Sequence, residues 1–219
     1  MKQPRALIFW GGWDGHKPQP TTKILANGLK RKGFDVQVEN SLDCLADVEA
    51  LKKYDLIIPN WTMCKAIPHE GVKALIAAVR EGVGLGGIHG GMGDAFRGMV
   101  EYEWMCGGIF LSHPHIGDYK VRVVDKFHPI MKDTPPMFDY NSEQYYMLVE
   151  PGLHILAETE YVYEGRAFTM PVAWIKTWGK GRVFYSALGH DAPKEFKEHP
   201  HVLKMTMRGL LWAANQLKK

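Results

Sequence analysis

The first ninety residues alternate short apolar runs with amphipathic segments, and this alternation constrains the fold more than any other feature of the sequence. The runs that resemble strands are residues 5–10, 34–38, 55–59 and 83–89. Between the last two, residues 68–82 carry Val72, Leu75, Ile76 and Val79 at helical spacing. Strands and helices that alternate at this pace form parallel β-α-β units with right-handed crossovers. The sequence therefore predicts an α/β fold with a doubly wound parallel sheet.

The second half of the chain has a different pattern. Residues 117–125 alternate apolar and polar side chains like an antiparallel strand, whereas residues 127–152 contain several prolines, which disfavour regular elements. We expect an irregular insert at about 109–152 that carries substrate contacts, because long loops in compact domains are usually functional. Further strands are predicted at residues 153–159, 170–177 and 181–188, and a final helix at 200–217. No repeat or linker divides the sequence, so a single domain is expected over residues 1–219.

The composition excludes several classes of protein. Lys and Arg number 27 against 24 Asp and Glu, a net charge of +3 without a long basic run, so we expect no nucleic-acid partner. The apolar runs are far shorter than the roughly 20 residues of a membrane-spanning helix, so we expect no membrane partner. The three cysteines form no C-x-x-C pair, and the first residues resemble a strand and not a signal peptide. Both features favour a cytoplasmic location.

A glycine-rich turn supplies the sharpest local signal. Gly87-Ile-His-Gly-Gly91 directly follows an apolar strand and has the spacing of a nucleophile elbow, in which glycines allow a turn that lifts the central side chain above the sheet. The central residue is His89, and an imidazole is a good general base or metal ligand but a poor acyl-transfer nucleophile. The alternative is a Gly-rich turn with an incidental histidine. The neighbouring glycines 82–87 lie inside the strand, so no nucleotide cofactor is expected.

Five histidines lie at predicted strand ends or in the adjoining loops. They are His16, His89, His113, His115 and His190. Because the carboxyl ends of parallel strands meet in one crevice, we expect these side chains to converge there and, with Glu143 or Asp191, to bind a divalent metal, with zinc favoured. The alternative is that each is an exposed loop histidine. A second His-Pro-His at residues 199–201 begins the final helix and is interpreted as solvated surface.

Carboxylates and aromatic side chains complete the candidate site. Glu143 lies in an acidic and phenolic segment, residues 139–146, where a carboxylate could remove or return a proton. The residues predicted to be catalytic are His89, Glu143 and His190. Those predicted to bind substrate, in part by stacking on a sugar face, are Trp13, Asp14, His16, Trp61, Tyr145 and Asp191. The structural alternative for Trp is core or rim packing.

Several stretches in this order resemble the trehalose-utilisation (ThuA) family, which is related to the class I glutamine amidotransferases. They are Phe9-Trp-Gly-Gly-Trp-Asp-Gly-His16, Gly82-Val-Gly-Leu-Gly-Gly-Ile-His89, Leu111-Ser-His-Pro-His115, Asn141-Ser-Glu-Gln-Tyr-Tyr146, Gly179 to Asp191, and Arg208-Gly-Leu-Leu-Trp-Ala213. The resemblance covers nearly the whole chain. It implies a flavodoxin-like, mostly parallel sheet with helices on both faces, and a role in the catabolism of trehalose or related disaccharides.

One departure from the amidotransferases argues against glutamine hydrolysis. Those enzymes place a Cys in the elbow, where this chain has His89, so the nucleophile is missing; His190 occupies roughly the place of the partner histidine. The resemblance also implies a role beside sugar oxidoreductases that produce 3-keto disaccharides. A metal held by histidines would polarise such a ketone while Glu143 or His89 moves a proton, giving isomerisation, epimerisation or elimination.

The alternative is a non-catalytic sugar-binding or regulatory module on an amidotransferase-like scaffold that lacks the Cys nucleophile. A sugar binder needs aromatic and amide side chains, and five imidazoles at strand ends exceed that need. In either case the expected ligand is a small-molecule sugar. We also expect a homo-oligomer, since the aromatic-rich insert at about 109–152 could form an interface.

Overall fold

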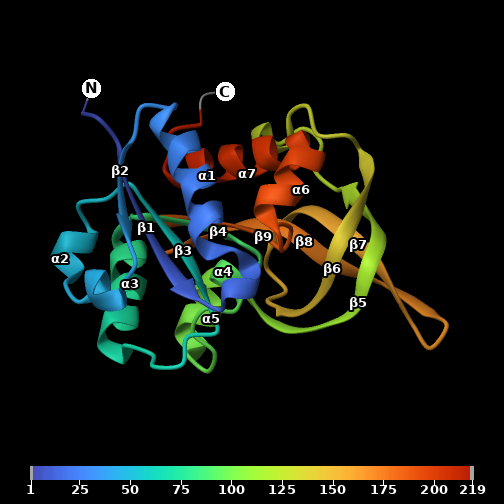
Figure 1. Cartoon of the computed structure of the whole chain (residues 1–219), viewed down its shortest axis with the longest axis horizontal. Helices are drawn as coiled ribbons and strands as arrows, with labels where there is room; N and C mark the ends of the chain where they lie inside the picture. The colour runs from blue at the N-terminus through green and yellow to red at the C-terminus, as the bar shows by residue number, and fades with distance from the viewer. Residues whose placement is uncertain (1, 218–219) are drawn as a thin grey trace.

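The chain folds around one twisted, nine-stranded mixed sheet, in the order β2-β1-β3-β4-β9-β8-β7-β5-β6 (Figure 1). The computed structural model describes residues 2–217. The strands are β1 (Arg5–Gly12), β2 (Asp35–Glu39), β3 (Leu56–Thr62), β4 (Gly84–Ile88), β5 (Gly108–Val123), β6 (Met137–Val149), β7 (His154–Tyr163), β8 (Arg166–Trp178) and β9 (Gly181–Ser186). The helices are α1 (Pro18–Lys30), α2 (Val48–Leu51), α3 (His69–Glu81), α4 (His89–Gly93), α5 (Val100–Cys106), α6 (Ala192–Glu198) and α7 (Pro200–Ala213), with 3-10 turns η1 (Asp14–His16), η2 (Leu42–Leu45) and η3 (Pro129–Met131).

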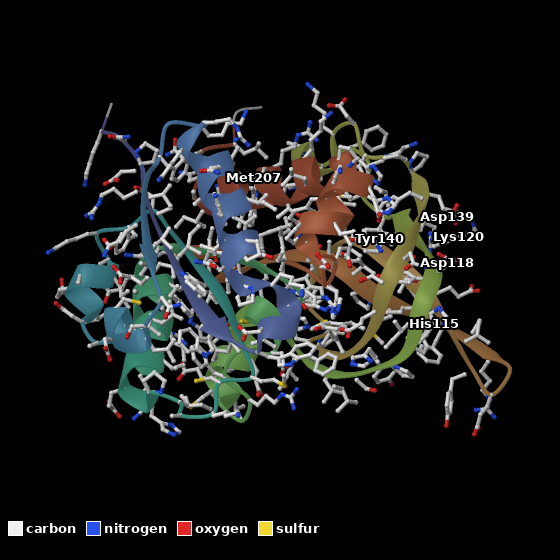
Figure 2. The ribbon with its side chains drawn as sticks, in the orientation of Figure 1. His115, Asp118, Lys120, Asp139, Tyr140 and Met207 are labelled. Carbon is white, nitrogen blue, oxygen red and sulfur yellow. The ribbon has the colours of Figure 1, made fainter. Side chains whose placement is uncertain are left out.

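The first half of the sheet is parallel, and helices cover both of its faces. β1 pairs in parallel with β2 and β3, β3 with β4, and β4 with β9. Side chains alternate between two apolar clusters: Ile8 and Phe184 pack on the side of α1, α6 and α7, whereas Phe9 and Tyr185 pack on the side of α3 and α5. Figure 2 shows Met207 of α7 close to α1, where its sulfur packs over a glycine of that helix. The parallel half therefore presents the carboxyl ends of its strands at one edge.

The prediction of a doubly wound, mostly parallel, flavodoxin-like sheet is wrong. Beyond β9 every pairing is antiparallel: β8 with β9, β7 with β8, β5 with β7, and β5 with β6. For β7–β8 and β8–β9 the physical reason is the length of the connections. β7 and β8 are joined by Glu164 and Gly165, both with positive φ, and β8 and β9 by Gly179 and Lys180. Such two-residue turns can join only antiparallel neighbours, because a parallel pair needs a crossover of a dozen or more residues.

Residues 127–152 were also expected to be irregular, and this expectation is wrong for most of them. β6 (Met137–Val149) pairs along its length with β5 (Gly108–Val123), so the predicted insert at about 109–152 is largely a long antiparallel pair. The prolines lie outside the strand: Pro135 and Pro136 precede it and Pro151 follows it. They mark the ends of β6 and do not interrupt it.

Within the described residues 2–217, no helix has the length and apolar character needed to cross a membrane.

The turn after β1 depends on a glycine, and substituting it should be costly. Gly12 has φ +80°, and a Cβ there would lie 1.9 Å from the carbonyl oxygen of Thr62. Gly33 has a similar φ of +88° but no atom within 4 Å of such a Cβ. We expect Gly12→Ala to lower the free energy of unfolding by roughly 3 kcal/mol or more, against about 1 kcal/mol for Gly33→Ala, measured by urea denaturation. Equal losses would contradict the steric reason.

Candidate metal centre

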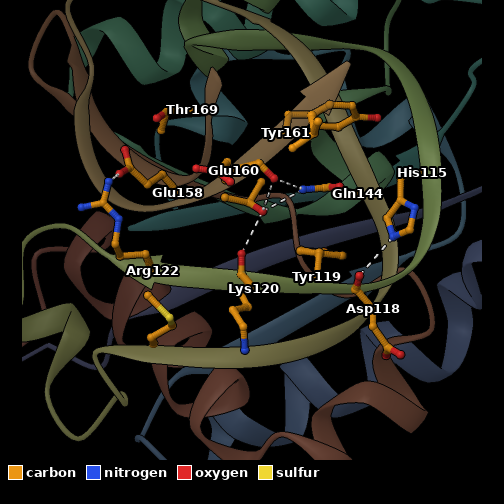
Figure 3. A pocket seen from close by; sticks show the side chains of 13 residues that line it. His115, Asp118, Tyr119, Lys120, Arg122, Gln144, Glu158, Glu160, Tyr161 and Thr169 are labelled. Atoms are coloured by element: carbon orange, nitrogen blue, oxygen red, sulfur yellow. Dashed lines mark hydrogen bonds and ion pairs between the residues drawn. The ribbon is translucent and has the colours of Figure 1, made fainter. Parts of the chain in front are cut away.

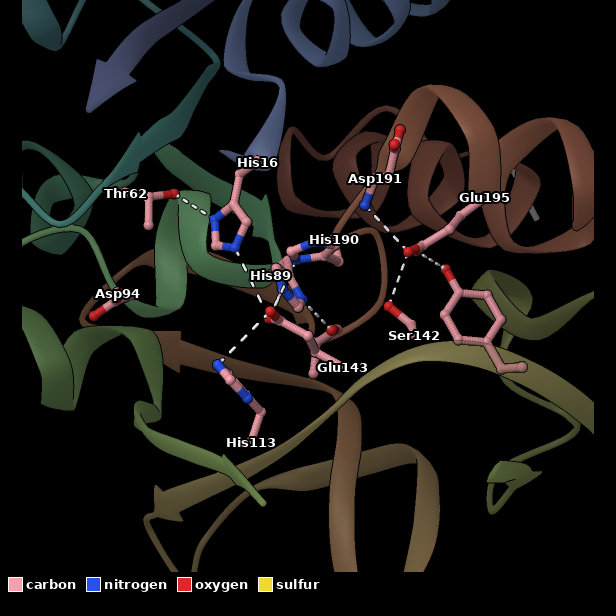
Figure 4. Close-up of polar contacts among 12 residues, drawn as sticks. His16, Thr62, His89, Asp94, His113, Ser142, Glu143, His190, Asp191 and Glu195 are labelled. Atoms are coloured by element: carbon pink, nitrogen blue, oxygen red, sulfur yellow. Dashed lines mark hydrogen bonds and ion pairs between the residues drawn. The ribbon is translucent and has the colours of Figure 1, made fainter. Parts of the chain in front are cut away.

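Four side chains converge where the parallel and antiparallel halves of the sheet meet. His16, His89, Glu143 and His190 each offer one ligand atom, and these atoms lie within 4.8 Å of one another (Figure 4). Three of the residues are buried and His190 is half-buried. This group of four is called the His/Glu cluster below.

The topology of the sheet places these residues. His16 closes the turn η1 after β1, His89 begins α4 directly after β4, and His190 follows β9 just before α6. These strands run in the same direction, so their carboxyl ends lie at one edge of the sheet. Glu143 comes from the middle of β6, at the far end of the strand order, and reaches the edge from the opposite side.

The hydrogen bonds of His89 show which ring nitrogen carries the proton in the neutral form. Its φ is +44°, the left-handed region that non-glycine residues seldom adopt, so the backbone of the turn is strained at this residue. Nδ1 lies 2.7 Å from the carbonyl oxygen of Ala187 and must donate to it, because a carbonyl only accepts. In the neutral ring Nε2 then carries a lone pair, and it lies 3.1 Å from Oε2 of Glu143. Two lone pairs at this distance are held together by a shared cation, which is either a proton or a metal ion.

His16 is held neutral beside them. Its Nδ1 lies 2.8 Å from the hydroxyl of Thr62, and its Nε2 lies 3.9 Å from Oε2 of Glu143. Burial, followed by the neighbouring His89 and His190, lowers the pKa of His16 to about 3. The ring fits closely because Gly90 has no side chain: a Cβ there would lie 2.4 Å from Cε1 of His16. A neutral imidazole of this kind is a ready metal ligand.

The third imidazole, His190, meets the same carboxylate oxygen through a poorly aligned contact. Nδ1 of His190 lies 3.2 Å from Oε2 of Glu143, yet it makes no hydrogen bond of acceptable alignment. The Glu143 carboxylate raises the pKa of His190 against the effect of burial. Burial alone would raise the pKa of the Glu143 carboxyl, but contacts with His190 and His89 outweigh it and hold that pKa well below its usual range. Glu143 is therefore an anion surrounded by imidazoles.

These observations fit a bound divalent metal ion. Three imidazole nitrogens and one carboxylate oxygen are the donor set that Zn²⁺ and similar ions prefer. The poorly aligned nitrogen of His190 and the close approach of His89 and Glu143 show that these side chains point at one small volume, where they could hold such an ion. The contacts of His16 with Thr62 and of His89 with Ala187 are the outer hydrogen bonds that usually orient metal ligands.

His113 lies beside the His/Glu cluster but faces the other carboxylate oxygen. Its Nε2 is 3.7 Å from Oε1 of Glu143, and its side chain is 39% exposed, the most open of the nearby histidines. Tyr145 stacks on the His89 ring with centroids 3.9 Å apart, and Phe110 packs against Tyr145. Tyr145, predicted to bind substrate, is itself buried under these rings. His113 is thus the imidazole best placed to meet both Glu143 and a ligand from solvent.

His115 is not part of the cluster. It is exposed, its Nε2 lies 3.1 Å from the carbonyl oxygen of Asp118, and Figure 2 places it with Asp118 and Lys120 at the outer margin of the molecule. There it lines a groove of about 500 Å³ with Gln144 and residues of β7 (Figure 3). Gln144 follows Glu143 on the strand and faces away from it, so the groove lies apart from the His/Glu cluster.

The other predicted substrate residues lie at different distances from the cluster. Trp13 is 45% exposed, and its ring centroid lies 4.8 Å from that of His16, so it forms an aromatic wall at the rim. Asp14 is exposed in the same turn. Trp61 packs over Gly11 and is half-buried. The side chain of Asp191 accepts from the backbone nitrogen of Lys194 and caps α6.

Two contributors were not anticipated from the sequence. Thr62, which orients His16, ends β3, and the rule that ligands gather at strand ends would have found it if hydroxyl residues had been included. Glu195 of α6 is a buried carboxylate bonded to Ser142 beside Glu143. No motif marks it, since α6 is short and its side-chain partners, Tyr140 and Ser142, lie more than fifty residues away in the sequence.

The metal-free protein should lose stability as the pH falls because of His16. Its pKa is about 3 in the folded chain against an ordinary value of 6.5, so between these values the unfolded state binds more protons. The contribution is complete above pH 6.5 and is lost as the pH falls towards 3. In chelator-treated protein we expect the free energy of unfolding to drop by up to about 1 kcal/mol per pH unit from pH 6.5 to 5. His16→Gln should flatten this slope; an unchanged slope would contradict it.

Comparison with known proteins identifies relatives of the whole chain. The family model described as "ThuA: Trehalose utilisation" matches residues 5–213. A ThuA-like protein of Parabacteroides merdae has a similar structure, with a TM-score of 0.79, 19% identity, and coverage of 100% of this chain and 92% of that one. A ThuA-like protein of Bacteroides uniformis gives 0.73 and 19%, with 96% and 93% covered. No curated protein matches the sequence.

Two other solved structures share the fold at lower similarity. A Salmonella typhimurium protein described as cytoplasmic has a TM-score of 0.62 and 17% identity, with 98% of this chain and 100% of that chain covered. A β-galactosidase of Bacillus circulans has a TM-score of 0.59 and 12% identity over 97% of this chain but only 30% of its own. At these identities the likeness concerns the fold alone.

Proposed function

The chain belongs to the ThuA family of trehalose-utilisation proteins, and from this premise we propose that it catalyses metal-assisted proton transfer on a 3-keto sugar. The observation that carries the proposal is the convergence of Nε2 of His89, Oε2 of Glu143 and the ring nitrogens of His16 and His190 within 4.8 Å of one another. His16, His89, His190 and Glu143 would hold the ion. A divalent ion bound there, with zinc favoured by this donor set, would supply Lewis acidity at the ketone by accepting its oxygen as a fifth donor.

The remaining side chains supply binding and proton transfer. Trp13 offers an exposed aromatic face at the rim for a sugar ring. His113 stands on the solvent side of Glu143 and can take a proton from a carbon next to the ketone and return it. Return of the proton to the same carbon on the opposite face gives an epimer, and its delivery to the former carbonyl carbon gives an isomer. Delivery of the proton to an oxygen substituent that leaves from the next carbon gives elimination. The four ligand candidates leave His113 free for this role.

Solvent exchange tests the proposal directly. Zinc-loaded protein incubated with 3-keto-trehalose in D₂O should introduce deuterium next to the ketone, as followed by NMR and mass spectrometry. Unoxidised trehalose is the matched control, because it has no acidic C–H and should gain none. A protein that binds 3-keto-trehalose but neither exchanges deuterium nor changes it would contradict the proposal. That result would favour a sugar-binding module, for which the exposed Trp13 is the supporting feature.

A further inference from the structure

Glu195 is a buried carboxylate that the proposed reaction does not use. It lies on α6 and is 3% exposed, and no ion pair found among residues 2–217 includes it. Burying a carboxylate is costly unless hydrogen bonds replace the water that it loses. The buried carboxylate of Glu195 therefore needs hydrogen-bond donors around it.

Three neighbouring groups donate hydrogen bonds to the Glu195 carboxylate. Oε1 accepts from the hydroxyl of Ser142 at 2.8 Å and from the backbone nitrogen of Asp191 at 3.1 Å, and Oε2 accepts from the hydroxyl of Tyr140 (Figure 4). Three donors satisfy the carboxylate. They come from two separate parts of the chain, since Tyr140 and Ser142 belong to β6 and Asp191 to the turn after β9.

Two of these donors lie next to candidate metal ligands in the sequence. Ser142 directly precedes Glu143, and Asp191 directly follows His190. Within the sheet, β8, β7 and β5 separate β9 from β6, so the strand ladder connects Glu143 to His190 only indirectly. Glu195 makes the direct connection, and the two candidate ligands that it connects lie 3.2 Å apart, from Oε2 to Nδ1.

We propose that Glu195 is a positioning residue that holds Glu143 and His190 at ligand spacing by joining β6 to the His190 turn. The expected effect of Glu195 on metal affinity rests on the proposed metal centre. Removing a hydrogen-bond partner that orients a ligand typically weakens metal binding by about 10 to 100-fold. The hydrogen-bonded connection between β6 and the His190 turn does not depend on a metal, and it can be measured separately from metal affinity.

Three variants test the proposal. Glu195→Ala removes every acceptor, whereas in Glu195→Gln the amide oxygen can still accept from Ser142 and Asp191 and the NH₂ group can donate to Tyr140. Phe196→Leu alters the next residue of α6, which is buried in the core, without touching these contacts. Phe196→Leu is therefore the control for effects that arise only from a lower stability of the folded chain.

Two measurements are made on the whole folded chain. In chelator-treated protein, amide hydrogen exchange at Glu143 and Asp191 should speed up in Glu195→Ala but not in Glu195→Gln or Phe196→Leu. In zinc titrations, Glu195→Ala should bind about 10 to 100-fold more weakly than the wild type, with Glu195→Gln restoring most of the affinity. Unchanged exchange, or equal zinc affinity in wild type and Glu195→Ala, would overturn the positioning role. Wild-type protein that binds no zinc while the exchange result holds would instead overturn the proposed metal centre and leave the joining in place.

Discussion

Glu143→Gln is expected to abolish both metal binding and turnover. The substitution removes the one negative charge among three imidazoles and replaces Oε2, which lies 3.1 Å from His89 and 3.2 Å from His190. Since losing a residue that merely orients a ligand costs about 10 to 100-fold in affinity, we expect losing this carboxylate to weaken zinc binding by at least about 100-fold. Isothermal titration with zinc and the deuterium-exchange assay measure the two effects.

A control on the same strand separates this effect from a general loss of charge. Asp139→Asn on β6 removes one carboxylate that is exposed and paired with Lys120. Zinc affinity and exchange in this variant should stay within about twofold of the wild type, since exposed ion pairs contribute little. Glu143→Gln that still binds zinc as the wild type does would show that the carboxylate is no ligand.

His113→Ala is expected to separate turnover from metal binding. Nε2 of His113 faces Oε1 of Glu143, whereas His16, His89 and His190 address Oε2, so removing it leaves the candidate ligands in place. General acid and base catalysis typically contributes 10² to 10⁴-fold, so kcat should fall by about that factor while zinc affinity stays nearly unchanged. Steady-state kinetics of the exchange reaction and zinc titration are measured on the same preparation.

His115→Gln is the matched control for His113→Ala. His115 lies two residues further along β5, is exposed, and contacts the carbonyl oxygen of Asp118 on the other face. Its substitution should leave kcat and zinc affinity unchanged. A comparable loss of kcat in both variants, or a large loss of zinc affinity in His113→Ala, would contradict the assignment of His113 to proton transfer.

The parallel half of the fold could be predicted from the sequence. The antiparallel half could not, because local patterns do not specify which strands pair. The strands expected at residues 5–10, 34–38, 55–59 and 83–89 are confirmed as β1, β2, β3 and β4. Around β6, however, the flanking prolines predict an irregular segment, whereas the strand between them pairs with β5 along its length. Strand order depends on pairing between distant segments, which no local periodicity specifies.

The candidate site could likewise be predicted only in part, namely for the residues that follow strands of the parallel half. His16, His89 and His190 could be placed together because each follows a strand of the parallel half. His113 and His115 looked equivalent, since residues two apart on a regular strand share a face. Register shifts in β5 between Phe110 and Ser112 and between Ser112 and His115 break that alternation. Bulges of this kind re-aim side chains beside functional sites, and the sequence carries no plain signal for them.

Metal content tests the central claim most directly. Protein purified without a histidine tag or chelator is subjected to elemental analysis, together with His89→Ala and His115→Gln. We expect one divalent ion per chain, most of it zinc, in the wild type and His115→Gln, and its loss in His89→Ala. A wild-type protein that holds no divalent ion, even after reloading with zinc and dialysis, would contradict the account.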